Sequence, residues 1–233
     1  MKNHNAVATE TSLPSTEAAR QIMVDFMMSN FEMLSQEEAR VLFSFSQIKT
    51  FAQGDFLMKE GQIQRGCFFV IQGCVREYYL IDGEERTTAF YTDMQTVTSV
   101  ASSKPKSPVK FYLECLEDTV ATFLSIEAEM EMYRQFPWAE SLCRLGAEEI
   151  VSEYQNTLAN YMLSTPEERY LNLMEDRPEL LNRVPQYQLA SYLGVKPESL
   201  SRIRKRISTR GHLPPVSLVE HPGQSLKSAL SSR

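Results

Sequence analysis

The sequence changes its hydrophobic period twice, and this constrains the fold more than any other feature. Between residues 47 and 125, β-rich runs of four to seven residues alternate with glycines and acidic turns, whereas helical spacing precedes and follows them. The clearest turn is Asp82-Gly83, between VREYYLI and RTTAFY, because a type I′ hairpin turn needs positive φ at both centres. Many short strands at close spacing indicate an antiparallel roll or barrel. The sequence therefore predicts an α+β chain.

Composition narrows the chemistry. With 42% hydrophobic and 23% charged residues the chain can bury a core. No apolar run approaches the ~20 residues of a membrane helix, and the first residues lack a signal-peptide pattern, so we expect a cytoplasmic protein with no membrane partner. The four cysteines form no C-x-x-C pair and are expected to be free thiols. The three histidines, His4, His212 and His221, lie near the termini, which argues against histidine-based nucleophiles, zinc sites and haem sites. We predict no metal site and no enzyme, with carboxylate- or lysine-based chemistry left open.

Capping patterns mark two helix starts. Ser35 with Glu38 predicts a short helix that ends near Phe45. Thr165 with Glu168 predicts a second helix, with proline in its first turn, where the missing N–H costs nothing.

A long uninterrupted helix is predicted over residues 138–163. Its apolar positions follow three-and-four spacing: Leu142, Leu145, Ile150, Tyr154, Leu158 and Tyr161. Such a helix is ~38 Å long at 1.5 Å per residue, longer than the neighbouring β domain requires. We therefore predict that these six residues form a homodimer interface. Burial within one chain is the alternative, because Gly146, Ser152 and Asn156 weaken a strict heptad.

The segment VPQYQLASYLGVKPESLSRIRKRI, residues 184–207, is the most informative. Two short helices, 185–193 and 197–207, are predicted to meet at Gly194, which can take the left-handed conformation that ends the first helix. A common apolar face is expected from Leu189, Ala190, Leu193, Val195, Leu200 and Ile203. This is the helix-turn-helix pattern.

Polar residues of this segment suit DNA. We predict base readout by Glu198, Ser199 and Arg202, because a carboxylate can accept from cytosine and an arginine can donate two bonds to guanine. Phosphate contacts are predicted for Lys196, Ser201, Lys205 and Arg206. Residues 183–210 have a net charge of +6, against −13 for residues 1–182, so the basic segment can orient an acidic body towards phosphates. A packing helix with a solvated basic face is the alternative.

The motif QLASYLGVKPESLSRIRKRI, behind a glycine-punctuated β-roll and a long helix, resembles the catabolite activator/Fnr (Crp/Fnr) superfamily of bacterial transcription regulators over about residues 30–207. The resemblance implies an N-terminal cyclic-nucleotide-binding-like β-roll (a double-stranded β-helix), a central dimerisation helix and a C-terminal winged helix-turn-helix. Glu198 and Arg202 stand where family members contact base edges. Family members carry another arginine just before the acidic residue, and Pro197 stands at that position here. The resemblance therefore leaves the preferred DNA sequence open.

This organisation gives five expected parts. They are a disordered lead (1–16), a sensor domain (17–137), the dimerisation helix (138–163), the helix-turn-helix (164–210) and a flexible tail (211–233). The wing strands of the family are not evident in that tail.

The sensor half departs from the family. Residues 91–111 lack the glycine and arginine that hold the ribose and cyclic phosphate in cyclic-AMP-binding members. Lys104, Lys106 and Lys110 could supply positive charge, but lysine lacks the two-donor fork of arginine, and a surface cluster is the alternative. The pocket could be filled by Met94, Phe111 and Tyr112. We therefore predict no cofactor and at most weak cyclic nucleotide binding, with any other effector unidentified.

The sequence thus predicts a homodimeric transcription regulator that binds double-stranded, palindromic DNA, with RNA polymerase as a further candidate partner. Two other classes remain as alternatives. One is an effector-binding module without DNA binding, which the Glu198/Arg202 pair argues against. The other is an enzyme built on the roll, in which a carboxylate or Cys67 would act without histidine.

Overall fold

The structure is a computed structural model that describes residues 13–31, 34–97 and 107–210. Eight strands of these ranges form two antiparallel four-stranded sheets. The first sheet has the order β1-β8-β3-β6 and the second β2-β7-β4-β5. The strands are β1 (Gln47–Phe51), β2 (Phe56–Met58), β3 (Gly66–Gln72), β4 (Val75–Ile81), β5 (Glu84–Tyr91), β6 (Gln95–Val97), β7 (Tyr112–Cys115) and β8 (Thr119–Ser125).

The two sheets enclose one hydrophobic core and form the predicted β-roll. Alternate residues of the longer strands point into it, as the two-residue period of a strand requires, whereas Leu57 and Met58 of β2 are both buried at a break in the strand register. The buried members are Leu57, Met58, Phe68, Val70, Val75, Tyr91, Val97, Val109, Leu113 and Cys115. The antiparallel roll predicted from the sequence is confirmed.

The β4–β5 hairpin turns at Asp82 and Gly83, whose φ angles are 52° and 80°. Positive φ at both positions is what the Asp-Gly pair predicted. Two strands differ from the prediction. Strand β6 falls in a stretch assigned no strand, and the run VKFYLEC becomes a strand only at Tyr112. The physical reason is that the backbone of Val109 pairs with the turn at Gly61 and Gln62 instead of with a strand.

Helices α1 (Thr16–Asn30) and α2 (Gln36–Phe43) pack outside the first sheet. The Phe26 ring of α1 lies 5.1 Å from that of Phe69 on β3. Ser15 caps α1, so regular structure begins before the predicted limit of the lead at residue 16; residues 1–12 lie outside the described residues. The capping box of Ser35 with Glu38 is present as predicted.

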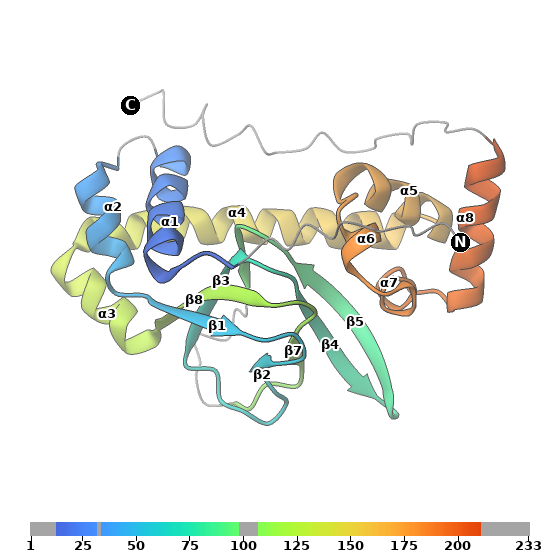
Figure 1. The fold of residues 1–233 in the computed structure, drawn as a ribbon, viewed down its shortest axis with the longest axis horizontal. Coiled ribbons are helices and arrows are strands. Elements are labelled where there is room, and N and C mark those ends of the chain that lie inside the picture. The colour runs from blue at the N-terminus through green and yellow to red at the C-terminus, as the bar shows by residue number, and fades with distance from the viewer. Residues whose placement is uncertain (1–12, 32–33, 98–106, 211–233) are drawn as a thin grey trace, which may run out of the picture.

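The remaining six helices of the described ranges follow the last strand of the roll in the chain (Figure 1). Helix α4 runs along the molecule, from the end that carries α1, α2 and α3 to the group formed by α5, α6, α7 and α8 (Figure 1). The bounds are α3 (Ile126–Gln135), α4 (Pro137–Leu163), α5 (Pro166–Asp176), α6 (Leu180–Arg183), α7 (Gln186–Tyr192) and α8 (Pro197–Arg210). The long predicted helix and the capping box of Thr165 with Glu168 are both confirmed.

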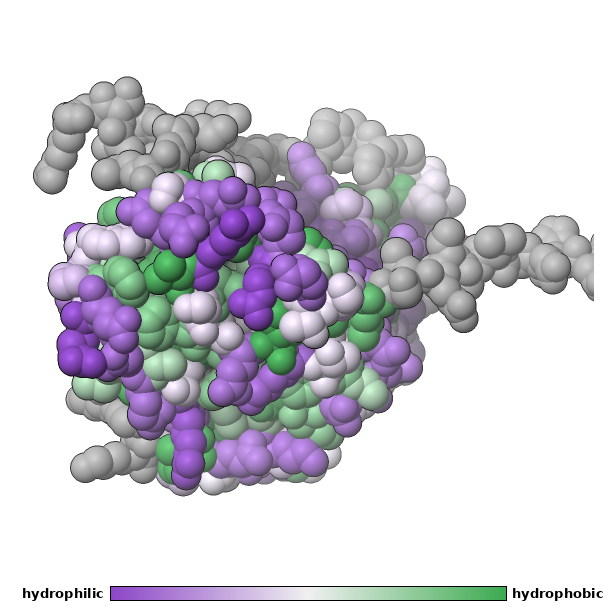
Figure 2. Space-filling model, turned by 60° about the vertical axis from the view of Figure 1, so that its left-hand side comes forward, coloured by the Kyte–Doolittle hydropathy of each residue, from purple (hydrophilic) through white to green (hydrophobic). Residues whose placement is uncertain are grey.

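The surface at the α2–α3 end interleaves hydrophobic and hydrophilic residues (Figure 2). None of the helices in the described ranges combines the length and apolar character that a membrane span needs.

Candidate DNA interface

Helices α7 and α8 are joined by a tight turn at Gly194. This residue has φ +70°, and its N–H donates to the Ser191 carbonyl at 3.0 Å. Glycine is needed here for the left-handed backbone conformation. A Cβ at position 194 would also lie 2.3 Å from the Tyr161 hydroxyl oxygen of α4, so the turn lies against the end of the long helix.

A hydrophobic core holds α7 and α8 in place. Of the six predicted apolar positions, five are buried and Val195 packs against them half-buried. The cluster also contains Tyr170, Leu173, Leu180 and Val184, so α8 is fixed by α5, α6 and α7 together. The same cluster includes Cys74 and Phe90 of the roll, which means that the two halves of the chain share packing.

The outward side of α8 carries the predicted base-reading residues. Glu198 and Arg202 are exposed and Ser199 is half-buried. The Arg202 Nε donates to the Glu198 carbonyl oxygen at 3.3 Å, so the guanidinium lies one turn back along the helix. Lys205, also exposed, follows on the same side, since residues three and four apart share a helix face.

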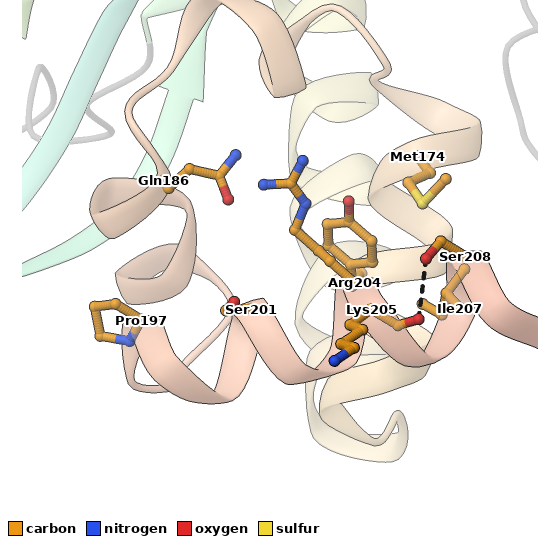
Figure 3. A pocket seen from close by; sticks show the side chains of 9 residues that line it. Met174, Gln186, Pro197, Ser201, Arg204, Lys205, Ile207 and Ser208 are labelled. Carbon is orange, nitrogen blue, oxygen red and sulfur yellow. Dashed lines mark hydrogen bonds between the residues drawn. The ribbon is translucent and has the colours of Figure 1, made fainter.

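A groove of about 900 Å³ runs beside α8. Ser201 and Lys205 line it together with Tyr170, Met174, Gln186, Pro197, Arg204, Ile207 and Ser208. Figure 3 shows Arg204 extending from α8 between Gln186 and Met174. Arg204 was not predicted as a site residue. The run RIRKR contains it, and the 3.6-residue period of a helix places it on the side of α8 away from Arg202.

One predicted phosphate contact is already engaged within the chain. Arg206 forms an ion pair with Glu167, an acid in the first turn of α5. DNA contact by Arg206 would require exchange of this carboxylate for a phosphate, so the structure leaves Lys196, Ser201 and Lys205 as the accessible members of that set.

Helix α7 also covers the edge of the second sheet. The Ser191 hydroxyl accepts from the Thr87 N–H at 3.0 Å and donates to the Glu85 carbonyl at 3.1 Å. Both partners lie on β5, whose outer edge would otherwise expose unpaired backbone groups. The helix-turn-helix is thereby docked on the roll.

Two arginines extend this docking. Arg177 donates to the Phe90 carbonyl at 2.8 Å and to the Thr92 hydroxyl at 2.8 Å. Arg183 reaches three groups of the roll, which are the Asp93 carboxylate at 2.7 Å, the Glu117 carboxylate at 2.5 Å and the Gly73 carbonyl at 2.8 Å.

A half-buried carboxylate lies on β4, on the same face of the strand as the core residue Val75. Glu77 accepts hydrogen bonds from Thr88 at 2.7 Å and from the Tyr91 hydroxyl at 3.2 Å. The Tyr91 hydroxyl lies 2.8 Å from that of Tyr154, which links the roll interior to α4. Burial raises the pKa of Glu77, although the hydrogen bonds from Thr88 and Tyr91 act in the opposite direction.

The predicted pocket residues do not converge. Met94 packs in the cluster beneath α1, whereas Phe111 joins the core of the roll and lies 6.0 Å from the Tyr79 ring. Tyr112 stacks on Tyr78 at 5.0 Å, on the face opposite to Leu113 and Cys115, and so points away from the roll interior. Lys110 is exposed, and Lys104 and Lys106 lie outside the described residues.

Helix α4 leaves an apolar stripe exposed. Of the predicted interface residues, Leu142 packs within the chain against the cluster around Ala139, and Leu145 and Ile150 are half-buried. The exposed stripe follows three-and-four spacing through Val151, Tyr154, Leu158, Tyr161 and Met162.

The structure joins a β-roll through the long helix α4 to a helix-turn-helix. Residues 48–136 match the cyclic nucleotide-binding domain family. The fold resembles that of FixK2 from Bradyrhizobium japonicum, with 17% identity, a TM-score of 0.59 and coverage of 78% of this chain and 96% of that one. A CooA mutant from Carboxydothermus hydrogenoformans has 19% identity, a TM-score of 0.57 and coverage of 87% and 95%. CprK complexed with OCPA has 16% identity, a TM-score of 0.55 and coverage of 75% and 85%.

No curated protein sequence matches the chain significantly. The domain match and the shared fold agree with the resemblance stated from the sequence: residues 48–136 match a cyclic nucleotide-binding domain, and the chain shares the fold of FixK2 and of the CooA mutant.

Proposed function

We propose that the protein is a homodimeric transcription regulator of the Crp/Fnr type that binds specific double-stranded DNA through α8. The observation that carries this proposal is the outward face of α8. There Glu198 and Arg202 stand one turn apart, both exposed, on a helix whose other side is anchored by Leu200 and Ile203. A carboxylate and a guanidinium presented in this way match the edges of cytosine and guanine in the major groove.

Charge supports the same orientation. The basic segment 183–210 belongs to a chain whose formal net charge is −6, so the α8 end is attracted to phosphates while the rest of the chain is repelled. Lys196 and Lys205 are the accessible cations beside the base-reading pair.

The proposed dimer supplies the second reading helix. One helix-turn-helix reads few base pairs, whereas a two-fold dimer places two of them about one turn of DNA apart on a palindromic site. The exposed stripe on α4 supports self-association through this helix.

The first test compares specific with random DNA. A preferred site is selected from a pool of random duplexes, and binding to it and to random DNA is measured at several salt concentrations. We expect binding to random DNA to weaken steeply as salt rises, because phosphate contacts release counterions. An effector-binding module without DNA binding would select no site and show no such salt dependence.

We predict that Arg202→Ala lowers the affinity for the selected site by ~1–3 kcal/mol, because it removes a two-donor base contact. Lys205→Ala, its matched control on the same face, should weaken selected and random DNA alike. Equal losses on both kinds of DNA for both variants would contradict base readout by Arg202.

We also predict that cyclic AMP and cyclic GMP bind at most weakly. An anionic cyclic phosphate buried in the roll needs a cation of fixed geometry, and residues 91–111 contain no arginine to supply it. Titration calorimetry with both nucleotides checks this. A micromolar or tighter dissociation constant would show that the lysines at 104, 106 and 110 replace the missing arginine.

The enzyme alternative would need Cys67 as a nucleophile, and its thiol is poorly suited to that role. Burial raises the pKa of the Cys67 thiol to about 11. The nucleophile is the thiolate, which is scarce at neutral pH when the pKa is so high. We therefore favour regulation over catalysis.

A further inference from the structure

A second groove lies at the end of the roll formed by β1, β2, β3 and β8, away from α8. Its volume is about 380 Å³, within the range of small-molecule sites. It is lined by Lys49, Leu57, Met58, Gln62, Ile63, Arg65, Phe68 and Phe123. Nothing in the proposed DNA-binding function uses these residues.

The floor of this groove is apolar and aromatic. The rings of Phe68 and Phe123 lie 4.9 Å apart, and Leu57 and Met58 beside them are buried. Ile63, at the rim, is an exposed large hydrophobic side chain. The hydrocarbon part of a ligand can therefore contact aromatic and aliphatic side chains at this floor.

Lys49 brings a charge onto this floor. Its Nζ lies 4.2 Å from the centroid of the Phe123 ring and 6.0 Å from that of Phe68. The neighbouring Ile48 packs on the α1 side of the sheet, so strand alternation directs Lys49 to the opposite face. Lys49 as a whole is half-buried, and its ammonium group lies over the rings.

The groove contains positive charge without a carboxylate. Lys49 and Arg65 are its cations, and no acidic residue is among the described residues that line it. Within the described ranges neither cation has an ion-pair partner within 4.0 Å, whereas arginines elsewhere do, for example Arg86 with Glu84. The chain has 30 acidic residues, yet none of them pairs with these two cations in the described ranges. Two unpaired cations beside an apolar floor match a ligand that has a negative charge and a hydrocarbon body.

We propose that this groove binds a small amphipathic anion, an aryl or short-chain carboxylate. Its carboxylate would be held between the Lys49 ammonium and the Arg65 guanidinium, which can donate two parallel hydrogen bonds. Its hydrocarbon body would lie on Phe68 and Phe123. The site does not depend on DNA binding, and the carboxylate of Glu77 does not line it.

The test is titration calorimetry of the full chain with 4-phenylbutyrate as the probe and its neutral amide as the matched ligand. We expect one probe molecule per chain, with the amide at least about tenfold weaker, because charge-assisted hydrogen bonds are lost. Lys49→Met keeps the apolar stem and removes the charge, and it should weaken the probe by a similar factor. Lys59→Met is the control, since Lys59 rests on Phe56 at 4.3 Å and does not line the groove.

Several results would overturn the site. The first is an absence of saturable binding at millimolar probe. The second is equal affinity for the acid and the amide, and the third is an equal loss of probe affinity in Lys49→Met and Lys59→Met. Binding of an acidic peptide in place of the probe would also count against it, since that identifies a protein partner. Should Lys49→Met fail to fold, Arg65→Gln decides the question, because Arg65 is exposed and its replacement leaves the floor intact.

Discussion

Leu158→Glu is expected to convert the protein from dimer to monomer and to lower its affinity for a palindromic DNA site by ~100-fold or more. In a dimer, binding of one α8 helix holds the second α8 close to its half-site, and this gain in affinity is lost in a monomer. Leu158 is 59% exposed in the single chain and stands in the middle of the stripe that runs from Val151 to Met162 on α4. A glutamate there would place two like charges near the two-fold axis, in a surface that must be dehydrated on pairing.

This position is a cleaner test than two others on the same helix. The Tyr154 hydroxyl lies 2.8 Å from that of Tyr91, so a charge at 154 would also disturb the roll. Ile150 is half-buried within the chain, and a charge there would affect folding as well as association. Leu158 is not a member of any of the buried clusters of the described chain.

The measurements are sedimentation velocity at micromolar protein and titration of a selected palindromic duplex. Ala159→Glu provides the control, because it adds the same charge at an exposed neighbour that lies about 100° around the helix. A wild-type protein that sediments as a monomer, or a Leu158→Glu variant that remains dimeric, would contradict the proposed interface.

Elements with a strong local signal could be predicted from the sequence. The Asp82-Gly83 turn, the capping boxes at Ser35 and Thr165, and the left-handed Gly194 depend on residues within a few positions of one another. The apolar face of the helix-turn-helix was predictable for the same reason, since 3.6-residue spacing identifies it.

Contacts between distant segments could not be predicted in this way. Met94 and Phe111 are only 17 positions apart, yet Met94 packs in the cluster beneath α1 and Phe111 in the core of the roll, so a short distance along the chain does not bring them to one pocket. The pairing of Arg206 with Glu167 brings together α5 and α8, and a basic run gives no sign of which cation is neutralised. The docking of Ser191 on β5 joins residues about a hundred positions apart and has no periodic signal.

Arg183→Met is expected to lower the free energy of unfolding by about 2 kcal/mol, which lowers Tm by about 4–8 °C for a chain of this size. The guanidinium joins α6 to Asp93, Glu117 and the Gly73 carbonyl, and its side chain is 21% exposed. Removal would leave two carboxylates facing one another without a cation. Because those carboxylates are 45% and 36% exposed, water screens them, and the cost falls below that of a fully buried pair.

The pH dependence gives this prediction a second readout. Burial alone would raise the pKa of Asp93, but the hydrogen bonds from Arg183 and from the Gly73 N–H outweigh it, and the pKa is lowered. A lowered folded-state pKa contributes stability that is fully present above the unfolded value of about 3.9 and is lost as the pH falls through the folded value. Wild type and Arg183→Met should therefore differ at pH 7 and converge in acid.

Arg144→Met tests whether any ion pair would give the same result. Arg144 pairs with Glu148 at 2.6 Å on α4, with both side chains 61% exposed, and such pairs contribute about 0.5 kcal/mol or less. Adding Glu117→Gln to Arg183→Met should recover part of the lost Tm, because it removes one of the two stranded carboxylates. A difference between wild type and Arg183→Met that is no larger than that for Arg144→Met, or one that persists unchanged in acid, would show that Arg183 does not hold the helix-turn-helix to the roll by its charge.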